Sequence, residues 1–245
     1  MNDSQATSRS TQTPGTPDGD ELAALRGAPV LLLHGFLSTP RALRPLARRL
    51  ERDGFRVFSV GLGGFAGRFN TRRRIDELAR AVRDEVERIY QQNPGMGRLF
   101  VIGHSQGGLI ASWWVKRLGG HRRVRTLVTL GTPHRGTRMA WAGILLAWLM
   151  PSIVQMLPGS RFMRRLRDTA WPARVGLVSI WSRRDRVAPW PSAILEARGA
   201  NVRNVEVDAG HGDYLLKKRI YGAIVRELRR TEAPRLRPAA VPVAA

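Results

Sequence analysis

A serine between two glycines is the first feature of this sequence that could do chemistry. Gly103-His104-Ser105-Gln106-Gly107 stands where an apolar, strand-like run ends and a helix-like run begins. This is a G-x-S-x-G pattern in a strand-turn-helix context, where the glycines let the helix approach the strand closely. The turn raises the hydroxyl to a helix N-terminus, where N–H groups stabilise charge developing on an attacked carbonyl oxygen. We therefore predict that Ser105 is a nucleophile in acyl transfer.

A serine hydroxyl is a weak nucleophile, so it needs a base to take its proton and a carboxylate to orient that base. With this turn, the partners follow in the chain order serine, acid, histidine. Asp185 follows a strand-like run, and His211 lies between the last strand-like and the last helix-like run. Asp168 precedes its strand and so lies at the wrong end. Ser105, Asp185 and His211 form the predicted catalytic triad, although a turn aspartate and a structural loop histidine are the alternatives.

The tetrahedral intermediate requires backbone donors for its oxyanion. The pattern assigns one donor to Gln106, after the nucleophile, and the other to the loop that follows the first core strand. In "LLLHGFLSTP" that donor is Phe36, with Leu37 as an alternative. The predicted substrate-binding residues come either from the turns that follow strands or from an apolar segment later in the chain. They are Leu37, His104, His134, Trp141, Leu145 and Trp148.

Alternating strands and helices must position these groups. Apolar runs predict strands, and amphipathic repeats between them predict helices, which together indicate an α/β fold with a mostly parallel sheet of about six strands. The expected strands are 29–35, 55–62, 98–103, 124–132, 173–182 and 202–210, and the main helices are 40–53, 74–92, 106–118 and 214–230. The expected domain is 28–230, with disordered tails at 1–27 and 231–245.

One apolar segment, 139–157, falls outside this alternation. Its length is marginal for a membrane span, and strands of one sheet flank it on both sides. We predict an apolar cap over the active-site cleft, at about 137–170. A buried helical hairpin and a membrane anchor are the alternatives.

The charge of the chain is strongly positive, at +22. Such a charge favours anionic partners, but the arginines are spread over every expected surface element, so the first interpretation is a bias of composition and nucleic acid is the weakest partner. An anionic membrane surface is a stronger one, because "RFMRRLR" (161–167) flanks the apolar segment. Cysteine is absent and the first residues are polar, so we expect no metal site, no cofactor, no signal peptide and a cytoplasmic location. The oligomeric state is left open.

Three pieces of sequence resemble a known family. "HGF" follows the first strand, "GHSQGG" forms the turn, and "TLGTPHRGT" (129–137) follows the next strand. Together they resemble the α/β-hydrolase fold, and more closely the bacterial triacylglycerol lipases and related esterases, over about 28–225. The resemblance implies that His134 and Arg135 shape the cleft floor. The export signal and disulfide common in secreted members are missing here.

The leading hypothesis is a serine hydrolase that cleaves carboxylic esters with an apolar acyl chain. An acyltransferase or a thioesterase would use the same triad. A basic, non-enzymatic adaptor at a membrane surface is the rival from a different class, and it would be favoured only by a broken triad.

Overall fold

The computed structural model describes residues 25–62, 73–142, 150–196 and 201–236. Six parallel strands form one sheet in the order β2-β1-β3-β4-β5-β6, which confirms the predicted fold class. The strands are β1 (Pro29–Leu33), β2 (Arg56–Ser59), β3 (Leu99–His104), β4 (Val124–Leu130), β5 (Gly176–Trp181) and β6 (Val202–Glu206). The helical elements are η1 (Pro40–Leu43), α2 (Arg44–Arg52), α3 (Ile75–Gln92), α4 (Gln106–Arg117), η4 (Gly120–Arg122), α5 (Met139–Ala142), α6 (Pro151–Met156), α7 (Arg161–Asp168), α8 (Trp190–Ala193), η6 (Asp213–Leu215) and α9 (Lys218–Leu236).

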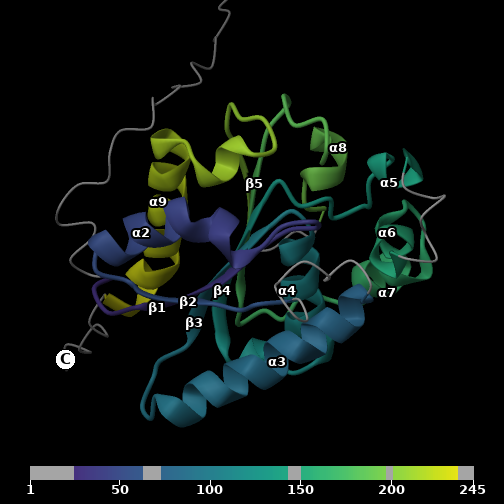
Figure 1. Cartoon of the computed structure of the whole chain (residues 1–245). Coiled ribbons are helices and arrows are strands. Elements are labelled where there is room, and N and C mark those ends of the chain that lie inside the picture. The colour runs from purple at the N-terminus through teal and green to yellow at the C-terminus, as the bar shows by residue number, and fades with distance from the viewer. Residues whose placement is uncertain (1–24, 63–72, 143–149, 197–200, 237–245) are drawn as a thin grey trace, which may run out of the picture.

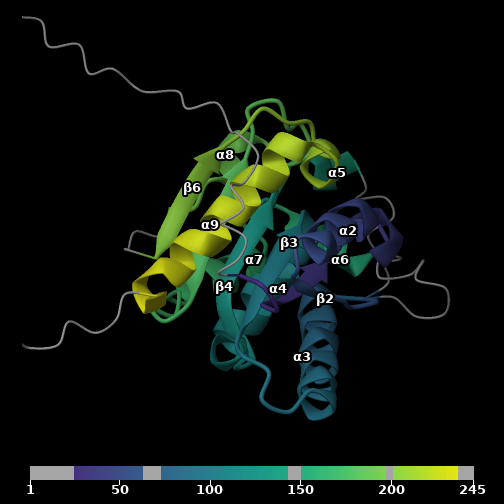
Figure 2. The same ribbon diagram turned by 90° about the vertical axis from the view of Figure 1, so that its left-hand side faces the viewer.

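Helices cover both faces of the sheet (Figure 1). Alternate residues of a strand point to opposite faces, so Leu31 and Val101 belong to one core cluster, and Leu32 and Ile102 to the other. The first cluster packs against α3, α4, α6 and α7, and the second against α2 and α9. The views in Figures 1 and 2 agree on this division. Burial on both faces explains why the inner strands are almost entirely apolar in sequence.

The order of the strands fixes where a ligand can bind. The chain leaves β1 toward β2 on one side, and it leaves β3 toward β4 on the other. In an open α/β sheet, the crevice lies at the carboxyl ends of two strands at such a switch point. The loop with Phe36 follows β1, and Ser105 follows β3. The topology therefore brings the predicted nucleophile and the predicted oxyanion loop to one crevice.

In its described part, the segment between β4 and β5 contains the short helices α5, α6 and α7, of which α7 contacts α4 and α5 contacts α6 (Figure 1). The Gln155 side chain ties α6 to the start of α3, because its amide nitrogen donates to Asp76 Oδ1 at 2.7 Å and its oxygen accepts the Ile75 N–H. Ile153 and Met156 are buried in the core. Among the helices of the described residues, none has the length and apolarity that a membrane span requires.

The described residues continue past the expected domain boundaries at both ends. Leu25 is buried, and the Gly27 N–H donates to the Gly54 carbonyl at 2.8 Å, so these residues pack on the domain instead of forming a tail. The last helix continues to Leu236 instead of ending at 230. An ion pair from Arg125 of β4 to Glu232 holds this extra turn against the sheet.

Candidate active site

The turn that carries Ser105 is strained. Ser105 has φ 53° and ψ −123°, and Leu37 is the other non-glycine residue with positive φ among the described residues. Such backbone strain persists only where neighbouring contacts hold it. Here the Ser105 N–H donates to the Leu130 carbonyl at 2.9 Å, and the Thr132 hydroxyl donates to the Ser105 carbonyl at 2.9 Å. The end of β4 thus fixes the turn that presents the serine.

Close approach explains the glycines around the serine. A Cβ on Gly103 would lie 2.6 Å from the Gly108 nitrogen, and one on Gly107 would lie 2.4 Å from the Leu33 carbonyl oxygen. Gly108 is equally confined, because its Cβ would lie 2.1 Å from Thr132 Oγ1. Gly108 lies outside the G-x-S-x-G pattern. Only glycines let α4 start this close to β1 and β3.

Gly107→Ala tests this packing. We expect a loss of about 1–3 kcal/mol in the free energy of unfolding, because α4 must move away from the β1 backbone. Urea denaturation measures it. Gly97→Ala is the matched control, since no atom lies within 4 Å of a Cβ placed there. Equal stability of the two variants would contradict the close approach.

Asp185 and His211 meet at the carboxyl edge of the sheet. Asp185 Oδ2 lies 2.9 Å from His211 Nδ1, and Asp185 Oδ1 accepts the N–H groups of Val187 and Ala188, both at 2.9 Å. The carboxylate is fully buried. A carboxylate can only accept, so the proton lies on Nδ1 and Nε2 is left as a base. The neighbouring Arg183 pairs with Glu206 at 2.8 Å.

Ser182 joins the two loops that carry this pair. Its hydroxyl oxygen accepts the N–H of Arg184 at 3.1 Å and the N–H of Ala209 at 3.0 Å. These donors stand one residue before Asp185 and two residues before His211. Ser182 is therefore a positioning residue that the sequence analysis missed, and its place directly after β5 is the only signal for it.

His104 contacts His211. Its Nε2 donates to the His211 carbonyl at 2.9 Å, and the two ring centroids are 4.8 Å apart. Burial, and then the neighbouring His211, lower the pKa of His104 to about 4. The ring is therefore neutral at pH 7 and supplies the donor. His104 was predicted to bind substrate, whereas the contacts make it a link between the nucleophile turn and the histidine loop.

His104→Gln is expected to change the pH dependence of stability. An unfolded histidine protonates near pH 6.5 and the folded His104 near pH 4, so the unfolded state gains protons between these values and stability falls as the pH is lowered. In His104→Gln, the decrease in the free energy of unfolding between pH 7 and pH 4 should be smaller than in the wild type by about 3 kcal/mol. Urea unfolding at both pH values measures this difference. His121→Gln, remote from the site, is the control, and an identical loss in both variants would contradict the assignment.

Tyr214 is a second residue that the sequence analysis missed. It is buried, and its ring stands edge-on to His211 at 6.4 Å between centroids. A Cβ on Gly131 would lie 2.6 Å from the Tyr214 ring and 2.7 Å from Asp185 Oδ2. Burial, followed by the nearby Asp185 carboxylate, raises the pKa of Tyr214, so its hydroxyl stays neutral. Tyr214 closes the inner side of the Asp185–His211 pair.

The predicted oxyanion donors flank the serine. Gln106 is the first residue of α4, where helical N–H groups have no partner within the helix. The loop from β1 lies against the nucleophile, because a Cβ on Gly35 would be 2.9 Å from Ser105 Cβ. Phe36 follows in that loop. Leu37 has φ 51° and is 68% exposed, so the backbone bends away directly after Phe36.

Among the other predicted substrate-binding residues, His134 lies in the described part of the chain. His134 Nε2 lies 3.0 Å from Thr129 Oγ1, and the imidazole lines a cavity that Ser105, Asp185 and His211 do not line. Burial, and then Lys116, lower the pKa of His134 to about 3. Leu145, Trp148 and the side chain of Trp141 lie outside the described residues.

Comparisons with known proteins agree with this geometry. A family model described as serine aminopeptidase, S33, matches residues 26–187. The chain is 28% identical to a GPI inositol-deacylase of Candida albicans over 72% of this chain and 43% of that protein. It is 30% identical to a triacylglycerol lipase of Burkholderia plantarii over 52% of this chain and 35% of that protein. The chain thus spans less than half the length of these relatives.

A solved structure, the mature form of the lipase BlEst2 of Bacillus licheniformis, superposes with a TM-score of 0.62 and 15% identity, over 86% of this chain and 92% of that one. This likeness shows the fold. The resemblance drawn from "HGF", "GHSQGG" and "TLGTPHRGT" is confirmed by the family match and by the lipase relative. The chain therefore belongs to the serine aminopeptidase S33 family of α/β-hydrolases.

Proposed function

We propose that this protein is a serine hydrolase that cleaves carboxylic esters with an apolar acyl chain. The observation that carries the proposal is the 2.9 Å contact of His211 Nδ1 with Asp185 Oδ2, at the sheet edge where the strained turn presents Ser105. A buried carboxylate, an oriented imidazole and a serine at a helix N-terminus form the set that nucleophilic acyl transfer requires.

Each group has one role in the proposed reaction. Ser105 Oγ attacks the ester carbonyl while His211 Nε2 takes the hydroxyl proton. The N–H groups of Phe36 and Gln106 bind the oxyanion. Collapse expels the alcohol, which receives the proton from His211, and leaves an acyl group on Ser105. Water then attacks the acyl-enzyme with His211 as the base, releases the acid and restores the serine.

Apolar side chains at the sheet edge support an apolar substrate. Among the described residues, six large hydrophobic side chains are exposed, and five of them lie within ten residues after the carboxyl end of a strand. These five are Leu37, Met139, Val187, Trp190 and Leu216. Parallel strands end at one edge of the sheet, so we expect these side chains to contribute to an apolar contact surface there. The name of the lipase relative is in line with a lipid ester.

A panel of p-nitrophenyl esters of increasing chain length, run on the wild type and on Ser105→Ala, tests the proposal. We expect kcat/KM to rise with chain length and to be lost in the variant. Product analysis with added alcohols separates hydrolysis from acyl transfer, and a matched thioester separates it from thioester cleavage. Release that persists in Ser105→Ala, or a preference for alcohol over water as acceptor, would overturn the proposed hydrolysis.

We also propose peripheral contact with an anionic membrane through α7. Its apolar residues Phe162, Met163 and Leu166 are buried in the core, whereas its four arginines are exposed. The helix can thus contribute charge to a membrane contact while its apolar face stays packed. Basic residues near an anionic surface contribute about 1 kcal/mol each.

Co-sedimentation with vesicles tests the membrane contact. The wild type should bind anionic vesicles, should not bind neutral ones, and should be released by high salt. Replacing the four α7 arginines, Arg161, Arg164, Arg165 and Arg167, by glutamine should weaken binding by ~10²-fold or more. Vesicle binding that is unchanged by high salt and by these substitutions would contradict an electrostatic contact at α7.

A further inference from the structure

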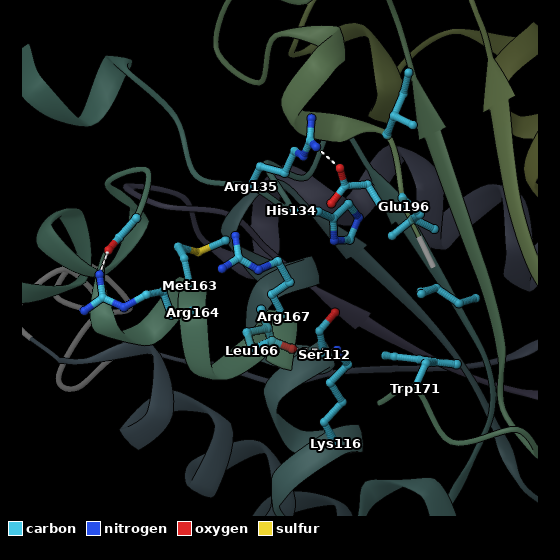
Figure 3. Close-up of a pocket in the computed structure, with 14 residues that line it drawn as sticks. Ser112, Lys116, His134, Arg135, Met163, Arg164, Leu166, Arg167, Trp171 and Glu196 are labelled. Atoms are coloured by element: carbon cyan, nitrogen blue, oxygen red, sulfur yellow. Dashed lines mark hydrogen bonds and ion pairs between the residues drawn. The ribbon is translucent and has the colours of Figure 1, made fainter. Parts of the chain in front are cut away.

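A cavity of about 500 Å³ lies between α4, α7 and β5, apart from the proposed catalytic groups (Figure 3). Ser105, Asp185, His211, Phe36 and Gln106 are not among its lining residues. Its volume is within the range of about 300–1,000 Å³ that small-molecule sites occupy. The proposed ester hydrolysis therefore leaves this space without a use.

The polar part of the lining is strongly cationic. Lys116, Arg135, Arg164 and Arg167 line the cavity, and Glu196 is its one acidic lining residue among those described. The Arg164 guanidinium points outward and donates to the carbonyl of Gly159, which also lines the cavity (Figure 3). Arg135 forms an ion pair with Glu196, as Figure 3 shows, which leaves three cations. Asp168 lies 3.6 Å from Arg167, but both side chains are about two-thirds exposed, so this pair neutralises little of the charge.

Lys116 is held where it can meet a ligand. Its Nζ donates to the Leu166 carbonyl at 2.6 Å and lies 5.9 Å from the centroid of the Trp171 ring. An ammonium has three donors, so two remain for a bound group. Burial, and then the positive charge of Arg117, lower the pKa of Lys116 to about 8. The group is still charged at pH 7, and a bound anion would offset the cost of its burial.

Apart from Ser112, His134 and Gly159, the remaining lining residues are apolar and come from three parts of the chain. Met163 and Leu166 belong to α7, Leu177 belongs to β5, and Trp171, Ile194 and Leu195 flank β5 in the sequence. Met163, Leu166 and Leu177 are buried. A small inorganic anion would leave this wall uncovered, and a neutral lipid would leave the cations without partners.

We propose that this cavity binds an anionic amphiphile, that is, a single alkyl chain with a carboxylate or phosphate head. The chain lies against Met163, Leu166 and Leu177, and the head is bound by Lys116, Arg164 and Arg167. This site goes beyond the proposed function, because its ligand does not react with Ser105. The acid released by ester hydrolysis belongs to the same chemical class.

Isothermal titration of the full-length Ser105→Ala protein tests the site. The probes are dodecanoate and dodecyl phosphate below their micelle concentrations, with 1-dodecanol and inorganic phosphate as partial ligands. We expect one amphiphile per chain, bound at least ~10-fold more tightly than either partial ligand, because both the head and the chain contribute. Binding of only one of the two amphiphiles would identify the head group. If inorganic phosphate bound as tightly as the amphiphiles, the proposal of an amphiphile site would be wrong.

The two flanks of α7 offer a matched pair of variants. Arg164 and Arg167 line this cavity, whereas Arg161 and Arg165 line a separate hollow beside α3 and α6. Arg164→Gln with Arg167→Gln should weaken amphiphile binding by ~10-fold or more, since charged hydrogen-bond partners are lost. Arg161→Gln with Arg165→Gln removes the same charge and should change it less than about twofold. Equal losses in both pairs would show a general effect of charge and overturn the site.

Quenching by 12-bromododecanoate locates the ligand. Bromine at the end of the alkyl chain should quench the Trp171 fluorescence, so Trp171→Phe should remove most of the quenching while leaving binding measurable by titration. Unchanged quenching in Trp171→Phe would place the amphiphile elsewhere, including the catalytic crevice, and would overturn the assignment. That result would leave the proposed ester hydrolysis intact, because activity depends on Ser105.

Discussion

Replacement of Ser105 or His211 by alanine is expected to lower kcat for ester hydrolysis by about 10⁴-fold or more, and the double variant should be little worse than either single one. In the proposed mechanism the serine loses its proton to the imidazole, so removing one group disables the other. Any turnover that remains above the uncatalysed rate in water would come from the oxyanion donors and from substrate binding. Steady-state kinetics with a p-nitrophenyl ester measures all three variants.

Ser59→Ala and His121→Ala are the matched controls, since both residues lie outside the site. They should retain the wild-type kcat. If the losses of the two single variants multiplied in the double variant, the serine and the histidine would not act as a unit, and the proposed mechanism would be wrong.

Asp185→Asn is expected to lower kcat by about 10⁴-fold while the fold is kept. An asparagine oxygen can still accept the N–H groups of Val187 and Ala188, which now bond to Asp185 Oδ1 at 2.9 Å. The new amide NH₂ would face His211 Nδ1, where it donates instead of accepting. The imidazole would then carry its proton on Nε2 and could not take one from Ser105.

The control for Asp185→Asn is Asp208→Asn. Asp208 lies in the neighbouring loop and pairs with Arg184 at 3.1 Å and Arg219 at 2.8 Å. This variant removes a carboxylate close in sequence to His211, and we expect an activity near that of the wild type. Equal losses in the two variants would point to a general electrostatic effect and would contradict the orienting role of Asp185.

The sheet could be predicted well from the sequence because buried strands have a simple sequence pattern. Strands covered on both faces are nearly continuous apolar runs, and "VLLL" and "LFVI" in β1 and β3 are of this kind. The chain order of Ser105, Asp185 and His211 was sufficient to select one acid and one histidine, and the structure places that acid and histidine 2.9 Å apart. Asp168, rejected for lying before its strand, is at the end of α7.

The contacts that support Asp185 and His211 have no such sequence pattern. His104 bonds to a backbone carbonyl 107 residues away, and Ser182 accepts an N–H from Ala209, 27 residues away. No local pattern encodes contacts of this kind, because they depend on which loops the sheet order brings together. For the same reason, His134 was expected at the cleft but lines the cavity between α4 and α7. The sequence placed four arginines in α7 but could not show that they divide between two hollows.

Covalent labelling by an alkyl fluorophosphonate, followed by peptide mass spectrometry, tests most directly that Ser105 is an activated nucleophile. Ser105 Oγ would form a bond to phosphorus with loss of fluoride, after transfer of the hydroxyl proton to His211. The account predicts one adduct per chain on the peptide that contains Ser105, at a rate that falls with loss of activity in His211→Ala. An adduct on another residue, or full ester hydrolysis by protein labelled at Ser105, would contradict it.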